Sequence, residues 1–548
     1  MLIAKQVYKL FRCPLPGPAA IDARAKQGQG RLAICAALAA ASILMETGLA
    51  LHAPFLRDEA QTIFIARLPH RTDVIEALAR DGGAPLFYFL LRYWMRVAGS
   101  GAGIRWLPIL LSSVTPAIIF LVGENLAGRT AGLAAAVWWL VNPVAVDAGA
   151  QVRMYCLAGA LGTLTLWAWI RFLSSGRLHY GVAGAAGGIA LLYTHNTGLV
   201  LLATVQIGWL AWAITARRRQ ALNARLMLRW AALQAVIVLV YLPWAPVLLR
   251  QISYDVTPWA GNIGIKRMLV NANCFFPLPV LSTAVPVAIV AAAGVIGATL
   301  YVFQKPEMVG LRPALALPVT GIAALAAATC FRGAFGPRYI LPWVPMLAIS
   351  LFALTGTALR KSLRRLTVAI LIACQAIGLI FASNRLAQPT NAPEIGKILT
   401  RNSAGAENVI VIPWEAGAPA ISYYLPPKAA EQIGFPTQGR VEIINWAFLK
   451  NRLSDDRAFA AFLHRIAAEA RRRKTLWLIC QTAALESSPV QQSQTFVNLE
   501  RSRQRDTIIW LESVAGRPAL QLRGCDCGYE SFALLRFEPS LHAKLPEH

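Results

Sequence analysis

The chain has 548 residues, of which 56% are hydrophobic and 15% are charged, and its mean hydropathy is +0.49. Soluble domains carry about a quarter charged residues, so this composition excludes an ordinary soluble protein and indicates a protein of the bilayer. The formal net charge of +26 would suggest nucleic acid as the partner of a soluble protein. Here many of the basic residues lie in short loops between apolar runs, where they mark the cytoplasmic side, and no nucleic-acid partner is expected.

The first 31 residues form a basic arm ahead of the first long apolar run, which extends from Leu32 to His52. A cleaved signal peptide is the alternative interpretation, but its apolar core would be shorter, and this run also contains Glu46. We therefore expect a cytoplasmic arm that is followed by an uncleaved membrane anchor.

Further apolar segments near the spanning length of about 20 residues recur as far as residue 382. Roughly eleven spans are predicted, at 32–52, 105–123, 130–146, 154–173, 180–194, 196–215, 230–249, 281–303, 313–330, 339–358 and 366–382. The densest basic loops, at 217–229 and 360–365, are expected in the cytoplasm. An odd number of crossings then places the C-terminal region outside. The predicted location is the bacterial inner (plasma) membrane, crossed many times, with a periplasmic C-terminal domain.

The segment Pro85–Ala98 is apolar, but its length of about 14 residues is too short for a span. It begins with proline and carries Arg92 and Arg96 beside Tyr93 and Trp94, a pattern typical of a helix at the membrane surface. We therefore assign this segment to a first outer loop, because counting it as a span would reverse the orientation of every later segment.

Ionisable and aromatic residues gather at those ends of the predicted spans that share the outer side. They are Asp58 and Glu59 after the first span, Arg105 before the second, Asp147 after the third, Arg153 and Tyr155 at the start of the fourth, His195 after the fifth, and Arg332, Arg338 and Tyr339 around the start of the tenth. A single residue of this kind is often only an interface anchor. The side that they share indicates a functional centre.

Several short motifs occur in an order that resembles the GT-C glycosyltransferases. They are Asp58-Glu59, Pro85-Leu86-Phe87-Tyr88, Arg105-Trp106-Leu107-Pro108, Gly128-Arg129, Arg153-Met154-Tyr155, Tyr193-Thr194-His195 and Pro337-Arg338-Tyr339. The resemblance covers about residues 32–360. It is greatest for the family-39-like branch that contains protein O-mannosyltransferases and the lipid A aminoarabinose transferase.

The resemblance implies a mainly α membrane protein, with a GT-C-like helical domain at 32–382 and a C-terminal α/β domain at 383–548. The first outer loop, residues 53–104, would carry membrane-surface helices and the acidic catalytic group. A sugar donor linked to polyprenyl phosphate is also implied. Two positions depart from the family pattern, because Gly83-Ala84-Pro85 replaces a basic motif of relatives and Gln151 stands where many have glutamate.

Transfer from a polyprenyl-phosphate sugar needs a base for the acceptor hydroxyl and positive charge for the departing phosphate. Asp58 is the predicted base, with Glu59 as its helper or as a ligand of a divalent metal ion. No cofactor is certain, because no cluster of metal-binding residues has the usual spacing. The residues expected to contact the donor phosphate or the substrate are Arg105, Arg153, Tyr155, His195, Arg332, Arg338 and Tyr339.

The C-terminal region has the mixed composition of a soluble α/β domain. Buried strands are predicted at 408–412 and 475–479, with a helix between them. A disulfide between Cys480 and either Cys525 or Cys527 would suit an oxidising compartment. The region is expected to cap the outer cavity or to help bind the acceptor.

Two other classes of function are compatible with the sequence. A transporter or lipid flippase would also have many spans with polar groups, although we find none of the internal repeats that are common in transporters. A non-catalytic subunit for envelope polysaccharide assembly would not need Asp58. Walker and dinucleotide-binding motifs are missing from the sequence, which disfavours direct use of a nucleoside triphosphate or a nicotinamide cofactor. The sugar and the acceptor, whether a lipid, a glycan or a protein, are not specified.

Overall fold

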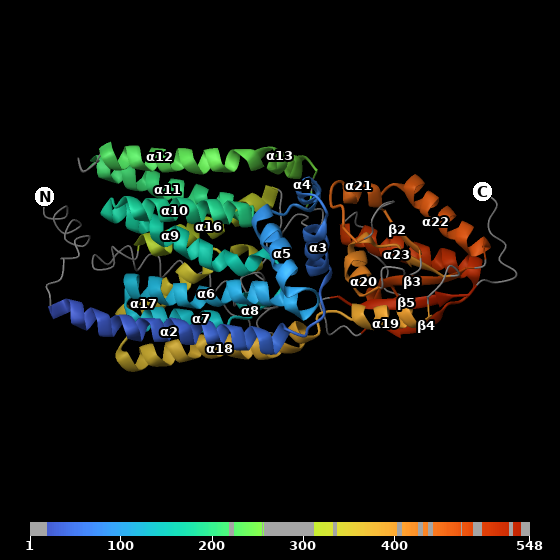
Figure 1. Cartoon of the computed structure of the whole chain (residues 1–548), viewed down its shortest axis with the longest axis horizontal. Coiled ribbons are helices and arrows are strands. Elements are labelled where there is room, and N and C mark those ends of the chain that lie inside the picture. Colours follow the sequence, from blue (N-terminus) through green and yellow to red (C-terminus); the bar gives the residue numbers. More distant parts are fainter. Residues whose placement is uncertain are drawn as a thin grey trace.

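The computed structural model describes residues 19–218, 224–254, 256, 312–331, 337–402, 408–425, 431–436, 442–472, 474–485, 496–524 and 530–538. Two parts follow one another along the longest axis of the molecule, a bundle of long helices and an α/β region with a five-stranded sheet (Figure 1). Three shorter helices lie between the two parts.

The helices of the bundle run along the long axis of the molecule (Figure 1). In chain order the described ones are α2 (Ala19–Ala50), α6 (Ala102–Ala127), α7 (Arg129–Leu140), α9 (Ala158–Ser175), α10 (Leu178–Thr194), α11 (Thr197–Arg218), α12 (Ala224–Tyr241), α16 (Arg312–Phe331), α17 (Val344–Ala358) and α18 (Lys361–Ala387). Their apolar side chains share one large core. α6 and α7 approach closely, because a Cβ atom on Gly123 would lie only 2.5 Å from the Cα atom of Gly132.

Five described helices are long and apolar enough to cross a membrane: α2 from Gln29, α6, α9 with the short helix η1 (Met154–Leu157), the segment Ala224–Ser253, and α18. α7 and α8 (Pro143–Ala150) together would form a sixth span, which is broken because the two helices meet at a bend of 62°. α11, α16 and α17 contain shorter apolar segments. The described helices do not establish the predicted count of eleven, and the predicted span 281–303 lies outside the described residues.

The bend between α7 and α8 has a local cause. Pro143 begins α8 and has no N–H group to continue the hydrogen bonds of α7. Asn142 caps α8, because its Oδ1 atom accepts hydrogen bonds from the N–H groups of Val144 and Ala145 at 3.0 and 3.1 Å. The Asn142 amide also donates to Gln375 of α18 at 3.0 Å. α8 therefore turns away from the line of α7 within the bundle.

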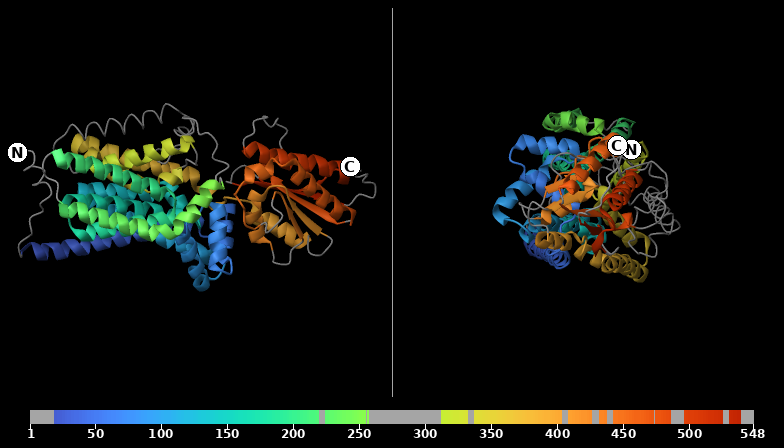
Figure 2. Two further views of the ribbon diagram at one scale, coloured as in Figure 1. Left: turned by 90° about the horizontal axis from the view of Figure 1, so that it is seen from above. Right: turned by 90° about the vertical axis from the view of Figure 1, so that its right-hand side faces the viewer.

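Three helices follow the first long helix: α3 (Arg57–Arg67), α4 (Arg71–Asp81) and α5 (Pro85–Ala98). They lie at one end of the bundle, and Figure 2 shows them projecting sideways beyond its outline. α5 begins with proline at its first turn and ends at Gly99, whose φ of 72° glycine adopts without strain. The segment predicted to lie at the membrane surface is therefore a helix of its own.

The C-terminal region contains a mixed sheet in the order β2-β1-β3-β5-β4. The strands are β1 (Asn408–Ile412), β2 (Glu431–Gly434), β3 (Thr475–Gln481), β4 (Ala519–Arg523) and β5 (Phe532–Phe537). β1 pairs with β2 and β3 in parallel, whereas β5 pairs antiparallel with β3 and β4. β1 and β3 are buried and apolar, as parallel strands covered on both faces are. The sheet thus contains both strands that the sequence predicted.

Helices pack around this sheet (Figure 1). They are α19 (Ala392–Asn402), α20 (Ala418–Tyr424), α21 (Leu449–Leu453), α22 (Asp456–Arg471) and α23 (Phe496–Ala515). The C-terminal region has a core of its own, and α20 packs against α3. The hydroxyl of Tyr424 accepts a hydrogen bond of 2.6 Å from the N–H group of Phe55, just before α3. The C-terminal region thus holds the first-loop helices from the side opposite the bundle.

Candidate active site

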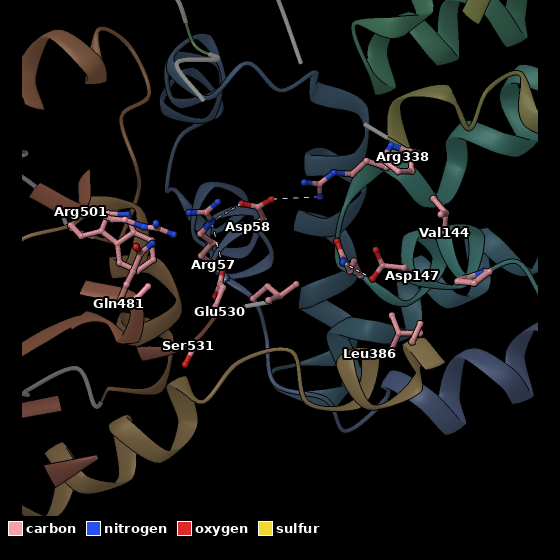
Figure 3. Close-up of a pocket in the computed structure, with 17 residues that line it drawn as sticks. Arg57, Asp58, Val144, Asp147, Arg338, Leu386, Gln481, Arg501, Glu530 and Ser531 are labelled. Carbon is pink, nitrogen blue, oxygen red and sulfur yellow. Dashed lines mark hydrogen bonds and ion pairs between the residues drawn. The ribbon is translucent and has the colours of Figure 1, made fainter. Parts of the chain in front are cut away.

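A cavity of about 600 Å³ lies where the bundle, α3 and the C-terminal region meet. α8, the short helix η5 (Pro337–Ile340) and the end of α18 form the bundle wall, and the C-terminal region forms the opposite wall (Figure 3). Val144, Leu386 and other apolar side chains line the bundle wall. The charged and amide-bearing residues of the lining are Arg57, Asp58, Asp147, Gln151, Arg338, Gln481, Arg501 and Glu530.

Asp58 faces this cavity from the first turn of α3, where the helix dipole favours a negative charge. Its Oδ1 atom lies 3.5 Å from Nε of Arg57, and its Oδ2 atom lies 3.7 Å from Nη1 of Arg338. Charge-assisted hydrogen bonds are about 2.7–2.9 Å long, so both contacts are loose. The side chain of Asp58 is 25% exposed and that of Arg338 is 38% exposed. A substrate can therefore reach both groups.

The charges around Asp58 keep it ionised. Burial by itself raises the pKa of a carboxyl group. At this carboxyl the guanidinium groups of Arg153, Arg57 and Arg338 outweigh burial and lower the pKa below the usual value of 3.8. Asp58 is thus a carboxylate at neutral pH, although one of low basicity.

Arg153 lies between α8 and η1, next to α3. Its Nη1 atom donates to the backbone oxygen of Asp58 at 3.2 Å and to the hydroxyl of Thr62 at 3.0 Å. Its Nε atom is buried and has no hydrogen-bond partner among the described residues. Arg153 is not part of the cavity lining, so in this structure it acts on Asp58 through its charge and by holding the α3 backbone.

The ring side chains of three predicted site residues, which come from three separate segments of the chain, lie together beside Arg338. The ring centroid of Tyr155 lies 5.2 Å from that of His195 and 5.9 Å from that of Tyr339, and the His195 and Tyr339 centroids are 5.5 Å apart. The guanidinium carbon of Arg338 lies 5.2 Å from the Tyr155 centroid and 6.0 Å from the Tyr339 centroid. The rings of Tyr155 and Tyr339 hold the Arg338 side chain by cation–π contact.

His195 ends α10 and is neutral. Burial lowers the pKa of His195 to about 3, and the charges of Arg153 and Arg338 act in the same direction. The backbone N–H group of Thr197 donates to Nδ1 of His195 at 3.1 Å. Because Nδ1 accepts this bond, the ring proton of the neutral form lies on Nε2. His195 can therefore donate a hydrogen bond, but it cannot serve as a base of ordinary strength.

Glu59, the neighbour of Asp58, points into the protein and not into the cavity. Its Oε1 and Oε2 atoms contact Nη1 and Nη2 of Arg105 at 2.8 and 3.1 Å, and the two side chains are 1% and 2% exposed. Glu59 also accepts hydrogen bonds from the N–H groups of Leu56 and Val152 at 2.9 and 2.8 Å. Arg105 donates to three further backbone oxygens, among them that of Ala150. The pair joins α3, α6 and the end of α8, and this geometry favours a structural role over the predicted catalytic and phosphate-binding ones.

The predicted divalent metal ion finds no suitable ligands at this pair. Arg105 and two backbone N–H groups occupy both carboxylate oxygens of Glu59. Within the described ranges, no three His, Cys, Asp or Glu side chains come close enough to hold a metal ion. Asp58 would therefore be a single protein ligand, and the arrangement does not fit a metal at Asp58 and Glu59.

The C-terminal region supplies a carboxyl group that sequence reasoning did not single out. Both carboxyl oxygens of Glu530 accept from the N–H group of Arg57, at 3.2 and 3.1 Å, and Oε1 lies 3.4 Å from Nε of Arg57. Burial raises the pKa of Glu530 to about 8, against the opposing charge of Arg57. Glu530 thus caps the helix that carries Asp58 and shares Arg57 with it.

Two further acidic groups belong to the site or lie next to it. Asp147 of α8 lines the cavity opposite Asp58 (Figure 3), and its Oδ1 atom accepts from Gln151 at 2.7 Å. Asp81 ends α4, where it accepts hydrogen bonds from the hydroxyl of Tyr88 at 2.9 Å and from the amide of Gln61. Burial raises the pKa of Asp81. The sequence analysis placed Asp147 among the residues at the outer span ends but gave it no role, whereas nothing in the sequence points to Asp81.

Three predicted residues cannot be placed. Arg332, a candidate for binding the donor phosphate, and both Cys525 and Cys527 lie outside the described residues. Cys480, their proposed disulfide partner, is buried in β3. These predictions stay predictions.

Comparison with known proteins gives a family match to part of the chain and a fold for most of it. A family model described as dolichyl-phosphate-mannose-protein mannosyltransferase matches residues 82–245. Among solved structures, ArnT from Cupriavidus metallidurans in the apo state matches with a TM-score of 0.54 at 12% identity, over 93% of this chain and 98% of that one. The same protein bound to undecaprenyl phosphate gives a TM-score of 0.52 at 12% identity, over 94% and 99%. No curated protein sequence matches the chain. At this identity the structural matches speak for the fold alone.

Proposed function

We propose that this multi-pass membrane chain is a member of the GT-C superfamily of glycosyltransferases and that it moves a sugar from a polyprenyl-phosphate-linked donor to an acceptor hydroxyl. The reaction takes place at the outer face of the bacterial inner membrane, and the acceptor is a lipid, a glycan or a protein. One observation carries the proposal. An ionised Asp58 and the guanidinium group of Arg338 meet across 3.7 Å at the edge of one accessible cavity.

The reaction requires one bond to form and one to break. The acceptor oxygen attacks the anomeric carbon of the donor sugar, and the bond between that carbon and the phosphate oxygen breaks. Asp58 takes the proton of the acceptor hydroxyl as a general base. The departing polyprenyl phosphate keeps the bonding electron pair, and the guanidinium group of Arg338 stabilises its negative charge.

The form of the cavity fits a donor that is half lipid and half sugar. Val144 and Leu386 give the bundle wall apolar side chains next to Arg338 and Asp147. A prenyl chain can follow the apolar side chains while its phosphate reaches the arginine. The carboxylate of Asp147 and the amide of Gln151 are suited to hydrogen bonds with sugar hydroxyls. The undecaprenyl phosphate bound to ArnT supports the lipid part of this proposal.

Donor binding would also prepare Asp58 for its role. The arginines that lower the pKa of Asp58 include Arg338. A phosphate bound to Arg338 offsets the charge of that arginine and adds negative charge close to the carboxylate. Both effects raise the pKa of Asp58, because they favour its neutral form. The base therefore gains strength only after the donor has bound, which favours a reaction order with donor first and acceptor second.

Replacing Asp58 with asparagine tests the proposal. Cells that lack the gene are complemented with the wild type or with Asp58→Asn, and their envelope glycolipids and glycoproteins are compared by mass spectrometry. Loss of a general base typically slows a reaction by about 10²–10⁴-fold, so the modified product should disappear while the protein still inserts in the membrane. Asp73→Asn is the matched control, because Asp73 lies in the same outer loop, on α4, and not in the cavity.

The same variant separates the rival functions. A flippase or a non-catalytic assembly subunit needs no base, so Asp58→Asn would still support the product in either case. A fully active variant would overturn the assignment of Asp58 and with it the proposed mechanism.

A further inference from the structure

α5 exposes an apolar edge away from the cavity. Phe87 and Leu91 on one face of α5 are fully buried, whereas Tyr93 and Val97 on the other face are exposed, Val97 at 84%. α5 belongs to the group that projects beyond the bundle at one end (Figure 2). A helix with apolar residues exposed beside the ends of membrane spans lies in the interface between headgroups and acyl chains. This edge of α5 therefore meets lipid.

Three arginines surround a second, smaller cavity at the end of this edge. Its volume is about 300 Å³, and its lining consists of Ala66, Arg67, Arg92, Met95, Arg96 and Gly99. Arg67 comes from the last turn of α3, and the other two arginines come from α5. Among the described residues, no carboxylate lines it. Three like charges this close repel one another unless an anion joins them.

The arginines are held in place by neutral partners. Arg92 donates to the backbone oxygens of Ala66 and Pro69 at 3.2 and 2.6 Å, and also to that of Leu68, which anchors it at the end of α3. Its charge is not cancelled there, because carbonyl groups carry only partial charge. The C-terminal end of a helix favours a cation, so this position is stable without a carboxylate.

Aromatic rings hold the other two guanidinium groups. Arg96 lies over the ring of Tyr93 at 5.2 Å, and Arg67 lies over the ring of Tyr423 at 5.9 Å. Arg71 donates to the Tyr93 hydroxyl at 3.0 Å and adds a fourth positive charge nearby. Within the described part of the chain, Arg96 makes no hydrogen bond or ion pair. A stacked guanidinium of this kind keeps its N–H edge for a further partner.

We propose that this arginine pocket binds the phosphate of an anionic phospholipid headgroup. Guanidinium groups bind phosphate oxygens through paired hydrogen bonds, and the exposed apolar edge beside the pocket accommodates the acyl chains. This second requirement selects a lipid over free phosphate. The pocket shares no residue with the Asp58 cavity, so the proposal stands whether or not the proposed reaction is correct. The bound lipid would fix the far end of α3, the helix that carries Asp58.

Native mass spectrometry of the full chain tests the proposal. The protein is released from detergent micelles to which equal amounts of phosphatidylglycerol and phosphatidylcholine have been added. The wild type should retain phosphatidylglycerol selectively. Each basic residue near an anionic lipid surface contributes about 1 kcal/mol, which is about fivefold in affinity, so Arg67→Gln/Arg96→Gln should weaken retention by about 25-fold. The control is Arg457→Gln/Arg465→Gln, two exposed arginines of α22 far from the pocket, and it should retain the lipid.

A second variant keeps the test decisive if the double variant does not fold. Val97→Glu places a negative charge on a side chain that is 84% exposed and follows Arg96 in the chain, so it should remove the preference for phosphatidylglycerol without disturbing the core. Equal retention of both lipids by the wild type would overturn the proposal, as would undiminished selectivity in Val97→Glu. Displacement of the lipid by millimolar inorganic phosphate would assign the pocket to free phosphate and overturn the choice of a lipid.

Discussion

Asp58 and Glu59 are neighbours on α3, yet their surroundings are opposite. Asp58 is partly exposed and meets two arginines at 3.5 and 3.7 Å, whereas Glu59 is buried and holds Arg105 through contacts of 2.8 and 3.1 Å. Loose ion pairs at a surface contribute little to stability, about 0–1 kcal/mol. A buried pair costs much more to break, because the remaining charge loses its partner. This difference is the reason why we propose chemistry at Asp58 and a structural role at Glu59.

The largest expected effect that tests the difference between Asp58 and Glu59 is a loss of stability in a Glu59 variant. Glu59→Gln leaves the buried guanidinium of Arg105 without its countercharge, and breaking a buried pair costs about 3–5 kcal/mol. We expect the purified variant to melt far below the wild type or to fail to accumulate in the membrane. Thermal unfolding in detergent measures the difference. Asp58→Asn provides the matched comparison one residue away, and it should melt within a few degrees of the wild type.

Equal melting of these two variants would contradict the division into a chemical and a structural carboxylate. If Glu59→Gln folded normally and lost activity, then Glu59 would have a direct role in the reaction after all.

The next effect concerns the partner of Asp58 across the cavity. Arg338→Gln removes a charge that we place on the donor phosphate, and a hydrogen bond to a charged group contributes about 1.5–3 kcal/mol. We therefore expect kcat/KM for the donor to fall by about 10–100-fold. Steady-state kinetics with a labelled polyprenyl-phosphate sugar measure the change. Arg338→Lys keeps the charge without the paired N–H groups, so its kcat/KM for the donor should lie between those of the wild type and Arg338→Gln. If kcat/KM for the donor were unchanged in Arg338→Gln, then Arg338 would not bind the donor phosphate, and the phosphate would have to bind in another part of the cavity.

The smallest effect concerns pH and the junction between the C-terminal region and α3. The pKa of Glu530 is about 8 in the folded chain, above its usual 4.5, so the folded state binds a proton that the unfolded state releases. This contribution to stability is complete below pH 4.5 and is lost as the pH rises through 8. The slope near pH 7 is about 1 kcal/mol per pH unit. Melting temperatures of the wild type should therefore fall between pH 6 and 8.5.

Glu530→Gln cannot lose a proton at this position, so its melting temperature should change less over the same pH range. Glu500 also has a raised pKa, of about 7, because it is buried. It would add its own pH dependence to both proteins, and only the difference between them reports on Glu530. Parallel curves for the wild type and Glu530→Gln would show that Glu530 is already ionised.

The sequence led to two charged residues of the cavity and to the rings beside them, because these residues lie at the ends of apolar segments, which the predicted topology places on one side of the membrane. Asp58, Arg338 and the rings of Tyr155 and His195 were found in this way, and the structure brings them together. The roles of adjacent residues could not be read in the same way. Consecutive residues of a helix point about 100° apart, so the direction of Glu59 became visible only with the position of Arg105.

The C-terminal region shows the same limit. β1 and β3 are continuous apolar runs, which the sequence reveals directly. β4 is an edge strand with mostly exposed residues, and β2 has only four residues, so neither carries a clear pattern. Glu530 could not be predicted because its partner Arg57 lies 473 positions earlier in the chain. Only the fold creates that contact.

That separation along the chain has a consequence for biosynthesis. The loop that carries Asp58 follows the first long helix, and its Arg57 is made 473 residues before Glu530. Until Glu530 is in place, α3 begins with an uncapped N–H group at Arg57, and the wall of the cavity that contains Trp414 and Arg501 has yet to dock. A nascent chain that has not reached Glu530, or one that terminates before it, therefore holds Asp58 in an unfinished pocket, and the proposed chemistry waits until the C-terminal region has folded.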